Sequence, residues 1–207
     1  MIKRILAGMV GLTLGLVLLF SSGCAGRSIS ARFYVLSPMA STGEEIKNIS
    51  SVSQDIAITI FPVSLPKYLR KSRIVTRTGN NELYLAEYDR WAGKIEEDIG
   101  RVVAENLSII LHTNRVFSSA AMEPLASDYT VKMEVIRFEG RLGGNLELFI
   151  RWTISDSREN VVYGVEGTQI IEPTGGATYA DLVAAQSRAL AAFSHELAGV
   201  IKKLADS

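Results

Sequence analysis

The stretch from Asp55 to Leu111 sets the strongest limits on how this chain can fold. Isoleucines alternate with other residues over Ile56–Phe61, which is the two-residue period of a β-strand. Both faces of this segment are largely apolar, so we expect a strand in the interior of a sheet. Pro62 and Pro66 follow it. Because proline cannot donate a backbone hydrogen bond, these two residues indicate a loop rather than a further strand.

A hairpin and a long helix complete this stretch. Ile74–Thr78 and Glu82–Tyr88 flank Gly79-Asn80-Asn81, which is a typical turn sequence. A helix is predicted to begin near Ala92, after Trp91. Its apolar residues recur at helical spacing and are Ile95, Ile99, Val102, Val103, Leu107, Ile110 and Leu111. They form one stripe, which indicates that the helix packs on the sheet.

The remaining segments extend this arrangement. Further strands are predicted at Arg32–Ser37, Val116–Ser119, Tyr129–Phe138, Leu146–Ile154 and Val161–Ile171, with polar loops at Met39–Ser53 and Met122–Ser127. The last three strands are joined by tight turns, which favours an antiparallel meander. A final helix begins after Thr178, a plausible N-cap with Asp181 three residues later. The predicted fold class is α+β: one domain with a mixed, largely antiparallel sheet and two long amphipathic helices packed on it.

The first residues have the composition of a secretory signal peptide. Lys3 and Arg4 precede an apolar run from Ile5 to Phe20. That run is short for a helix that must cross about 30 Å of hydrocarbon. We therefore predict a signal peptide at residues 1–23, a lipidated tether at 24–32 and the folded domain at 33–207.

Cys24 is the only cysteine of the 207 residues, so it cannot close an internal disulfide. The small residues before it resemble a bacterial lipobox, although Ser21 stands where leucine is usual. This resemblance implies acylation of Cys24 with three chains, a much firmer anchor than one chain provides. Ala25 in place of aspartate implies the outer membrane, with the domain facing the periplasm. The alternatives are an uncleaved membrane anchor and a soluble secreted protein with a free thiol.

Basic residues are concentrated just after Pro66. They are Lys67, Arg70, Lys71, Arg73 and Arg77, with Tyr68 and Leu69 among them. One interpretation is a patch that contacts phospholipid headgroups or an acidic partner. The other is a solvated loop whose charges are balanced by Glu82, Glu87 and Asp89.

Catalytic and metal-binding patterns are absent from the sequence. His112 and His195 have no nearby ligand pair, and no HExxH, CxxC or GxSxG motif occurs. Removal of residues 1–23 leaves 20 basic and 22 acidic residues, so no basic surplus indicates nucleic-acid binding. We expect no enzymatic activity, no catalytic residue, no metal and no cofactor.

Four features together resemble a known family. They are FYVLSP at the first strand, PVSLPKYLRKSRIVTRTGNNELYLAEYDRWA, the helix end ENLSIIL, and the lipobox Cys24. In this combination the chain resembles the PqiC-like auxiliary lipoproteins of ABC-type transport systems. The resemblance implies an outer-membrane lipoprotein that works with a periplasmic MCE-domain protein and its inner-membrane transporter. It further implies phospholipid as the transported molecule and a homo-oligomer as the possible assembly.

The resemblance also indicates which residues to examine. It implies a role in the fold or in a docking surface for Pro62, Leu65, Pro66, Leu69, Arg77, Glu87 and Trp91. With the basic loop residues Lys67, Tyr68, Arg70 and Lys71 they make up the predicted partner-docking set. Two alternative functions stay open: an envelope assembly factor, such as a regulator of cell-wall synthesis or a lipopolysaccharide-assembly plug, and a periplasmic hydrolase.

Overall fold

The computed structural model describes residues 29–39, 56–119 and 127–206. The chain divides into two compact units, residues 1–30 and residues 31–207, and the second unit is described below. The predicted signal peptide, Cys24, and almost all of the two predicted polar loops lie outside the described residues.

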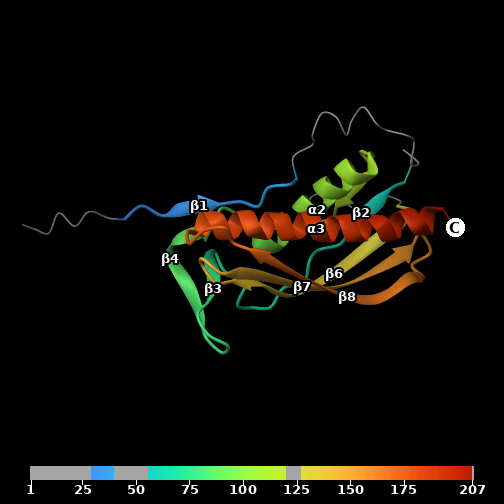
Figure 1. Cartoon of the computed structure of the whole chain (residues 1–207). Helices are drawn as coiled ribbons and strands as arrows, with labels where there is room; N and C mark the ends of the chain where they lie inside the picture. The colour runs from blue at the N-terminus through green and yellow to red at the C-terminus, as the bar shows by residue number, and fades with distance from the viewer. Residues whose placement is uncertain (1–28, 40–55, 120–126, 207) are drawn as a thin grey trace, which may run out of the picture. The chain divides into compact units, whose positions relative to one another are not determined.

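The larger sheet has five strands in the order β5-β2-β6-β7-β8 (Figure 1). Their bounds are β2 Ile58–Ile60, β5 Val116–Ser118, β6 Tyr129–Gly140, β7 Asn145–Asp156 and β8 Val161–Pro173. β2 is parallel to both of its neighbours, and β6, β7 and β8 form an antiparallel meander. The isoleucine-rich strand is therefore in the sheet interior, as its apolar faces predict, and every residue of β2 is buried.

The second sheet has three strands in the order β1-β4-β3. Their bounds are β1 Arg32–Tyr34, β3 Arg73–Arg77 and β4 Leu83–Trp91. β3 and β4 form the predicted antiparallel hairpin, whereas β1 is parallel to β4. β1 is shorter than the predicted strand, which extended to Ser37.

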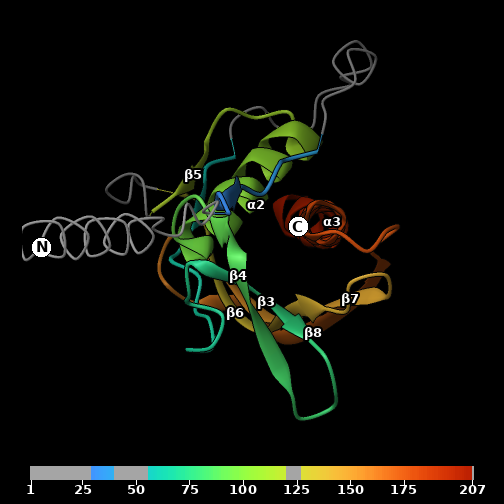
Figure 2. The same cartoon turned by 90° about the vertical axis from the view of Figure 1, so that its left-hand side faces the viewer.

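Two helices cover one face of the five-stranded sheet. α2 spans Ile95–Leu111 and contacts β2 and β5, and α3 spans Tyr179–Ala205 and contacts β7 and β8. The helices also pack on each other, as the view along α3 in Figure 2 shows. Each buries the apolar stripe that its sequence predicts, because burial of that stripe is what stabilises an amphipathic helix.

Local signals at the helix ends also agree with the structure. Thr178 and Asp181 form a reciprocal capping box, in which each side chain accepts from the backbone N–H of the other. α2 ends at Leu111. Its C-cap residue His112 has a left-handed φ of 53°, and the N–H of Thr113 donates to the Ser108 carbonyl. The hydrophobic core is continuous beneath both helices and both sheets.

The predicted α+β class and single domain are confirmed. The difference lies in the strands, which divide between two sheets instead of forming one. β4 pairs with β1 on its other side, and a register shift between Arg73 and Val75 interrupts its ladder with β3. The β3–β4 hairpin belongs with β1 to a separate sheet. This sheet contacts the large sheet where β3 packs against β6.

Candidate functional site

The predicted docking set centres on one exposed turn between β2 and β3. The carbonyl of Pro66 accepts from the N–H of Leu69 at 3.0 Å, and the carbonyl of Leu69 accepts from the N–H of Lys71 at 2.8 Å. The carbonyl of Ser72 then accepts from Trp91 at 2.7 Å, which joins the turn to the end of β4. Residues 66–73, which we call the basic loop, thus have a backbone held by its own hydrogen bonds and by β4.

The cations of the basic loop point to solvent. Lys67, Arg70, Lys71 and Arg73 are all exposed. Among the residues that the structure describes, none of the four has an ion-pair partner. Cations elsewhere do have one, as in the pairs Arg137–Glu147 and Arg188–Glu172. Within the described ranges the basic loop is therefore a surface whose positive charges have no ion-pair partner.

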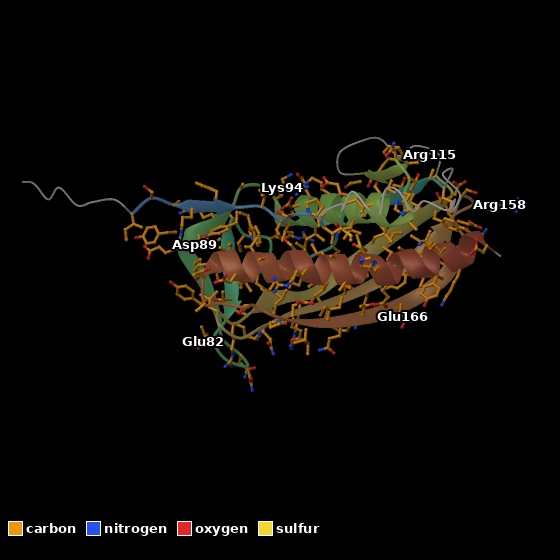
Figure 3. The ribbon with its side chains drawn as sticks, turned by 45° about the horizontal axis from the view of Figure 1, so that its top comes forward. Glu82, Asp89, Lys94, Arg115, Arg158 and Glu166 are labelled. Carbon is orange, nitrogen blue, oxygen red and sulfur yellow. The ribbon has the colours of Figure 1, made fainter. Side chains whose placement is uncertain are left out.

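The three carboxylates that were expected to balance this charge have other partners. Glu82 accepts from the Thr78 hydroxyl at 2.9 Å, and Glu87 raises the pKa of Tyr88 through a side-chain hydrogen bond. Asp89 is buried and lies 2.9 Å from Nε of Arg32. Figure 3 shows Glu82 and Asp89 well apart along the β4 hairpin. In the described part of the chain, the interpretation as a charge-balanced loop is thus not supported.

Two members of the docking set hold the loop in place. The hydroxyl of Tyr68 donates to Oε2 of Glu139 at 3.1 Å, and Nη2 of Arg77 lies 2.5 Å from Oε1 of the same carboxylate. The Glu139 side chain is fully buried. A buried carboxylate needs a cation and hydrogen bonds to offset its lost hydration. Tyr68 and Arg77 supply these, so they join the loop and β3 to β6.

This environment changes the acidity of Tyr68. Burial of the hydroxyl, followed by the nearby negative charge of Glu139, raises the pKa of Tyr68 from 10.0 to about 12. Tyr68 is therefore neutral and a hydrogen-bond donor throughout the physiological range.

Other members of the set belong to the core. Leu65, Leu69 and Trp91 are 5%, 6% and 7% exposed and pack in the continuous cluster. They surround a cavity of only about 10 Å³, room for no more than one water molecule. Pro62 and Glu87 are exposed. For the three buried residues the structure assigns a role in the fold, one of the two roles that the sequence left open.

A second set of polar contacts was not anticipated from the sequence. After β1 the chain crosses α2, where the N–H of Leu36 donates to Asp98 at 2.7 Å and the Leu36 carbonyl accepts from Arg101 at 2.8 Å. The N–H of Met39 donates to Asn106 at 2.8 Å. These polar side chains sit on α2 at spacings of three and five residues. They bind the segment after β1 to the helix.

A shallow groove of about 460 Å³ runs beside this segment. Val35 and Met39 line one side, and Ala180, Ala184 and Ala191 of α3 line the other. The lining is mainly apolar, with Tyr34 and Arg188 as its titratable side chains.

Within the described ranges, no group of histidine, cysteine, aspartate and glutamate side chains is placed to hold a metal ion. No helix among these residues is long and apolar enough to cross a bilayer.

Comparison with known proteins identifies the class. The family model for the ABC-type transport auxiliary lipoprotein component matches residues 34–198. The chain therefore belongs to this family, whose description is that of an auxiliary component.

Two comparisons add detail. The chain is 25% identical over 155 residues to the intermembrane transport lipoprotein PqiC of Escherichia coli K12, an alignment that covers 73% of this chain and 78% of PqiC. The crystal structure of protein XCC0632 from Xanthomonas campestris has a TM-score of 0.68 at 19% identity, with 85% of this chain and 98% of that one covered. The second likeness establishes a shared fold.

Proposed function

We propose that this protein is a non-enzymatic accessory subunit of an intermembrane phospholipid transport system. The family supports a role beside an ABC-type transporter. The name of the E. coli relative supports transport between membranes. In this proposal the domain docks a periplasmic MCE-domain protein, which connects it to the inner-membrane transporter.

Anchoring is the first part of the proposal. In this proposal the Cys24 thiol takes a diacylglyceryl group, cleavage before Cys24 frees its amine, and acylation of that amine completes three chains in the outer membrane. The short tether 24–32 then holds the domain on the periplasmic side. The hydrogen bonds of Leu36 and Met39 to α2 support this arrangement. They would pass any pull on the tether directly to a helix of the core.

Docking is the second part, and the exposed basic loop is the observation that carries it. Lys67, Arg70 and Lys71 project from a backbone fixed by Leu69 and Tyr68. Unpaired cations on a rigid support speed association with an acidic surface and orient the partner. We therefore place an acidic face of the MCE-domain partner against this loop.

A crosslinked pull-down from detergent-solubilised membranes tests both parts. The lipidated wild-type protein should recover an MCE-domain protein, and the Lys67→Glu/Arg70→Glu variant should lose it. Cys24→Ala should incorporate no labelled palmitate. Recovery of cell-wall or lipopolysaccharide machinery alone would contradict the transport proposal, and palmitate labelling of Cys24→Ala would contradict the anchor.

A further inference from the structure

Three exposed residues stand side by side across the three-stranded sheet. Arg90 on the central strand β4 is in register with Phe33 of β1 on one side and with Arg73 of β3 on the other. Side chains in register on neighbouring strands project from the same face of a sheet. We call Phe33, Arg90 and Arg73 the cross-strand row.

The row faces away from the core. Ile74, Asp89 and Trp91 are its immediate neighbours along β3 and β4, and all three are buried. Because successive side chains in a strand point to opposite faces, Arg73 and Arg90 must point outward. Phe33 is 65% exposed, which agrees with this direction. Figure 1 shows the sheet that bears the row at one end of the unit.

Arg73 and Arg90 carry like charges and lie opposite each other on neighbouring strands. Like charges directly opposite each other destabilise a sheet. Neither Arg73 nor Arg90 has an ion pair within the described part of the chain. The arrangement is unfavourable in isolation, and an anion bound between the two guanidinium groups would remove the repulsion.

Phe33, the third member of the row, indicates what kind of anion binds there. Phe33 sits beside Arg90, and Val35, also exposed, is two residues further along the same chain. Exposed apolar side chains next to cations are the composition of surfaces that lie at the boundary between headgroups and acyl chains. An aqueous phosphate would gain nothing from Phe33 or Val35, whereas a bilayer would bury both.

Covalent geometry brings this surface close to a bilayer. Phe33 is the ninth residue after Cys24, and a fully extended chain over these nine steps spans at most about 32 Å. If Cys24 is acylated, as proposed above, the row cannot be further than this from the membrane surface. Because β1 is the first strand of the domain, the row lies closer to the anchor along the chain than any other strand pairing.

We propose that the cross-strand row is a membrane-contact site that binds anionic phospholipid headgroups. Arg73 and Arg90 hold a headgroup phosphate between them, and Phe33 enters the interface beside it. The site sets the orientation of the anchored domain, with the three-stranded sheet towards the bilayer. This inference rests on the proposed acylation of Cys24. Of the basic loop only Arg73 belongs to the row, and the proposed docking of the protein partner rests on Lys67, Arg70 and Lys71.

The test uses the acylated full-length protein reconstituted in vesicles of phosphatidylethanolamine and phosphatidylglycerol with brominated acyl chains. Phe33→Trp places a fluorophore in the row, and Val165→Trp places one at an exposed position of β8 as a matched control. The native Trp91 and Trp152 are buried at 7% and 1% exposure, so their background is common to both variants. The acylated mass is measured first, which separates a failure of the anchor from a failure of the row.

The expected result is quenching and a blue shift for Phe33→Trp but not for Val165→Trp. Adding Arg73→Gln/Arg90→Gln should lower the ratio of membrane-contacting to free domain roughly 25-fold, about fivefold for each arginine near an anionic surface. Equal quenching at the two positions would overturn the proposal. Equal quenching of Phe33→Trp in vesicles of phosphatidylcholine would also overturn it. So would a blue shift of Phe33→Trp fluorescence that appears when the protein partner docks but not when vesicles are added.

Discussion

Arg77 on β3 and Glu139 on β6 join the two sheets through a partly buried ion pair. Nη2 of the arginine lies 2.5 Å from Oε1 of the carboxylate, and Nε lies 3.2 Å from the same atom. The Glu139 side chain is fully buried, and the hydroxyl of Tyr68 donates to its other oxygen. One carboxylate thus holds together the large sheet, the small sheet and the basic loop.

Arg77→Met should destabilise the domain by about 3–5 kcal/mol, because it removes the ion-pair partner of the buried Glu139 carboxylate. The measurement is urea-induced unfolding at neutral pH. Lys94→Met is the control, since Lys94 pairs with Glu97 at an exposed position. A surface pair of this kind contributes no more than about 1 kcal/mol. Equal losses for the two variants would contradict the account.

Tyr68→Phe should change how stability depends on alkaline pH. The folded pKa of about 12 lies above the ordinary value of 10.0, so the unfolded chain loses the Tyr68 proton first as pH rises. The contribution of this group is complete below pH 10 and is lost as pH rises from 10 towards 12. The wild type should therefore lose more stability than Tyr68→Phe across this window in denaturant titrations. Parallel curves would refute the assigned environment.

Leu69→Ala should lower the stability of the domain far more than charge reversal in the same loop. Leu69 is 6% exposed in the core, so its truncation should cost about 2–5 kcal/mol of stability. Lys67→Glu/Arg70→Glu alters exposed side chains and should change stability by no more than about 1 kcal/mol. Thermal unfolding of both variants separates the roles. A large loss in the charge-reversal variant would mean that the loop cations support the fold.

Gly140→Ala should destabilise the β6–β7 turn. A Cβ at this position would lie 2.4 Å from the carbonyl oxygen of Asn145 and 2.6 Å from Cα of Leu146, and backbone atoms cannot move aside easily. Overpacking of this kind costs about 1–3 kcal/mol. Gly164→Ala is the control, because nothing lies within 4 Å of its added Cβ. Chemical denaturation should show a loss for the first variant and none for the second.

Patterns within short segments could be predicted well from the sequence. Alternation identified the meander of β6, β7 and β8, and helical spacing identified α2 and α3 with the Thr178 cap. Each pattern involves residues a few positions apart. The local backbone conformation alone determines to which side of the strand or helix their side chains point.

Contacts between distant segments could not be predicted in the same way. Arg77 and Glu139 are 62 residues apart, and so are Leu36 and Asp98. A lone glutamate at the end of a strand does not reveal its partner, and the pairing of β1 with β4 depends on contacts that no local pattern encodes. For this reason the docking set combined core residues such as Trp91 with the exposed cations. The row of Phe33, Arg90 and Arg73 was missed because β1 and β4 are far apart in the chain.

The central claim is that the basic loop docks an acidic periplasmic partner. The most direct measurement is the affinity of the recovered MCE-domain protein for the purified wild type, for Lys67→Glu/Arg70→Glu and for Lys132→Glu/Arg158→Glu. The control variant makes the same change in charge at exposed positions, and Figure 3 shows Arg158 at the opposite end of the domain from Asp89. Only the loop variant should lose affinity, and binding by the wild type should weaken with added salt. Equal affinity of the three proteins, or equal loss in the two variants, would contradict the account.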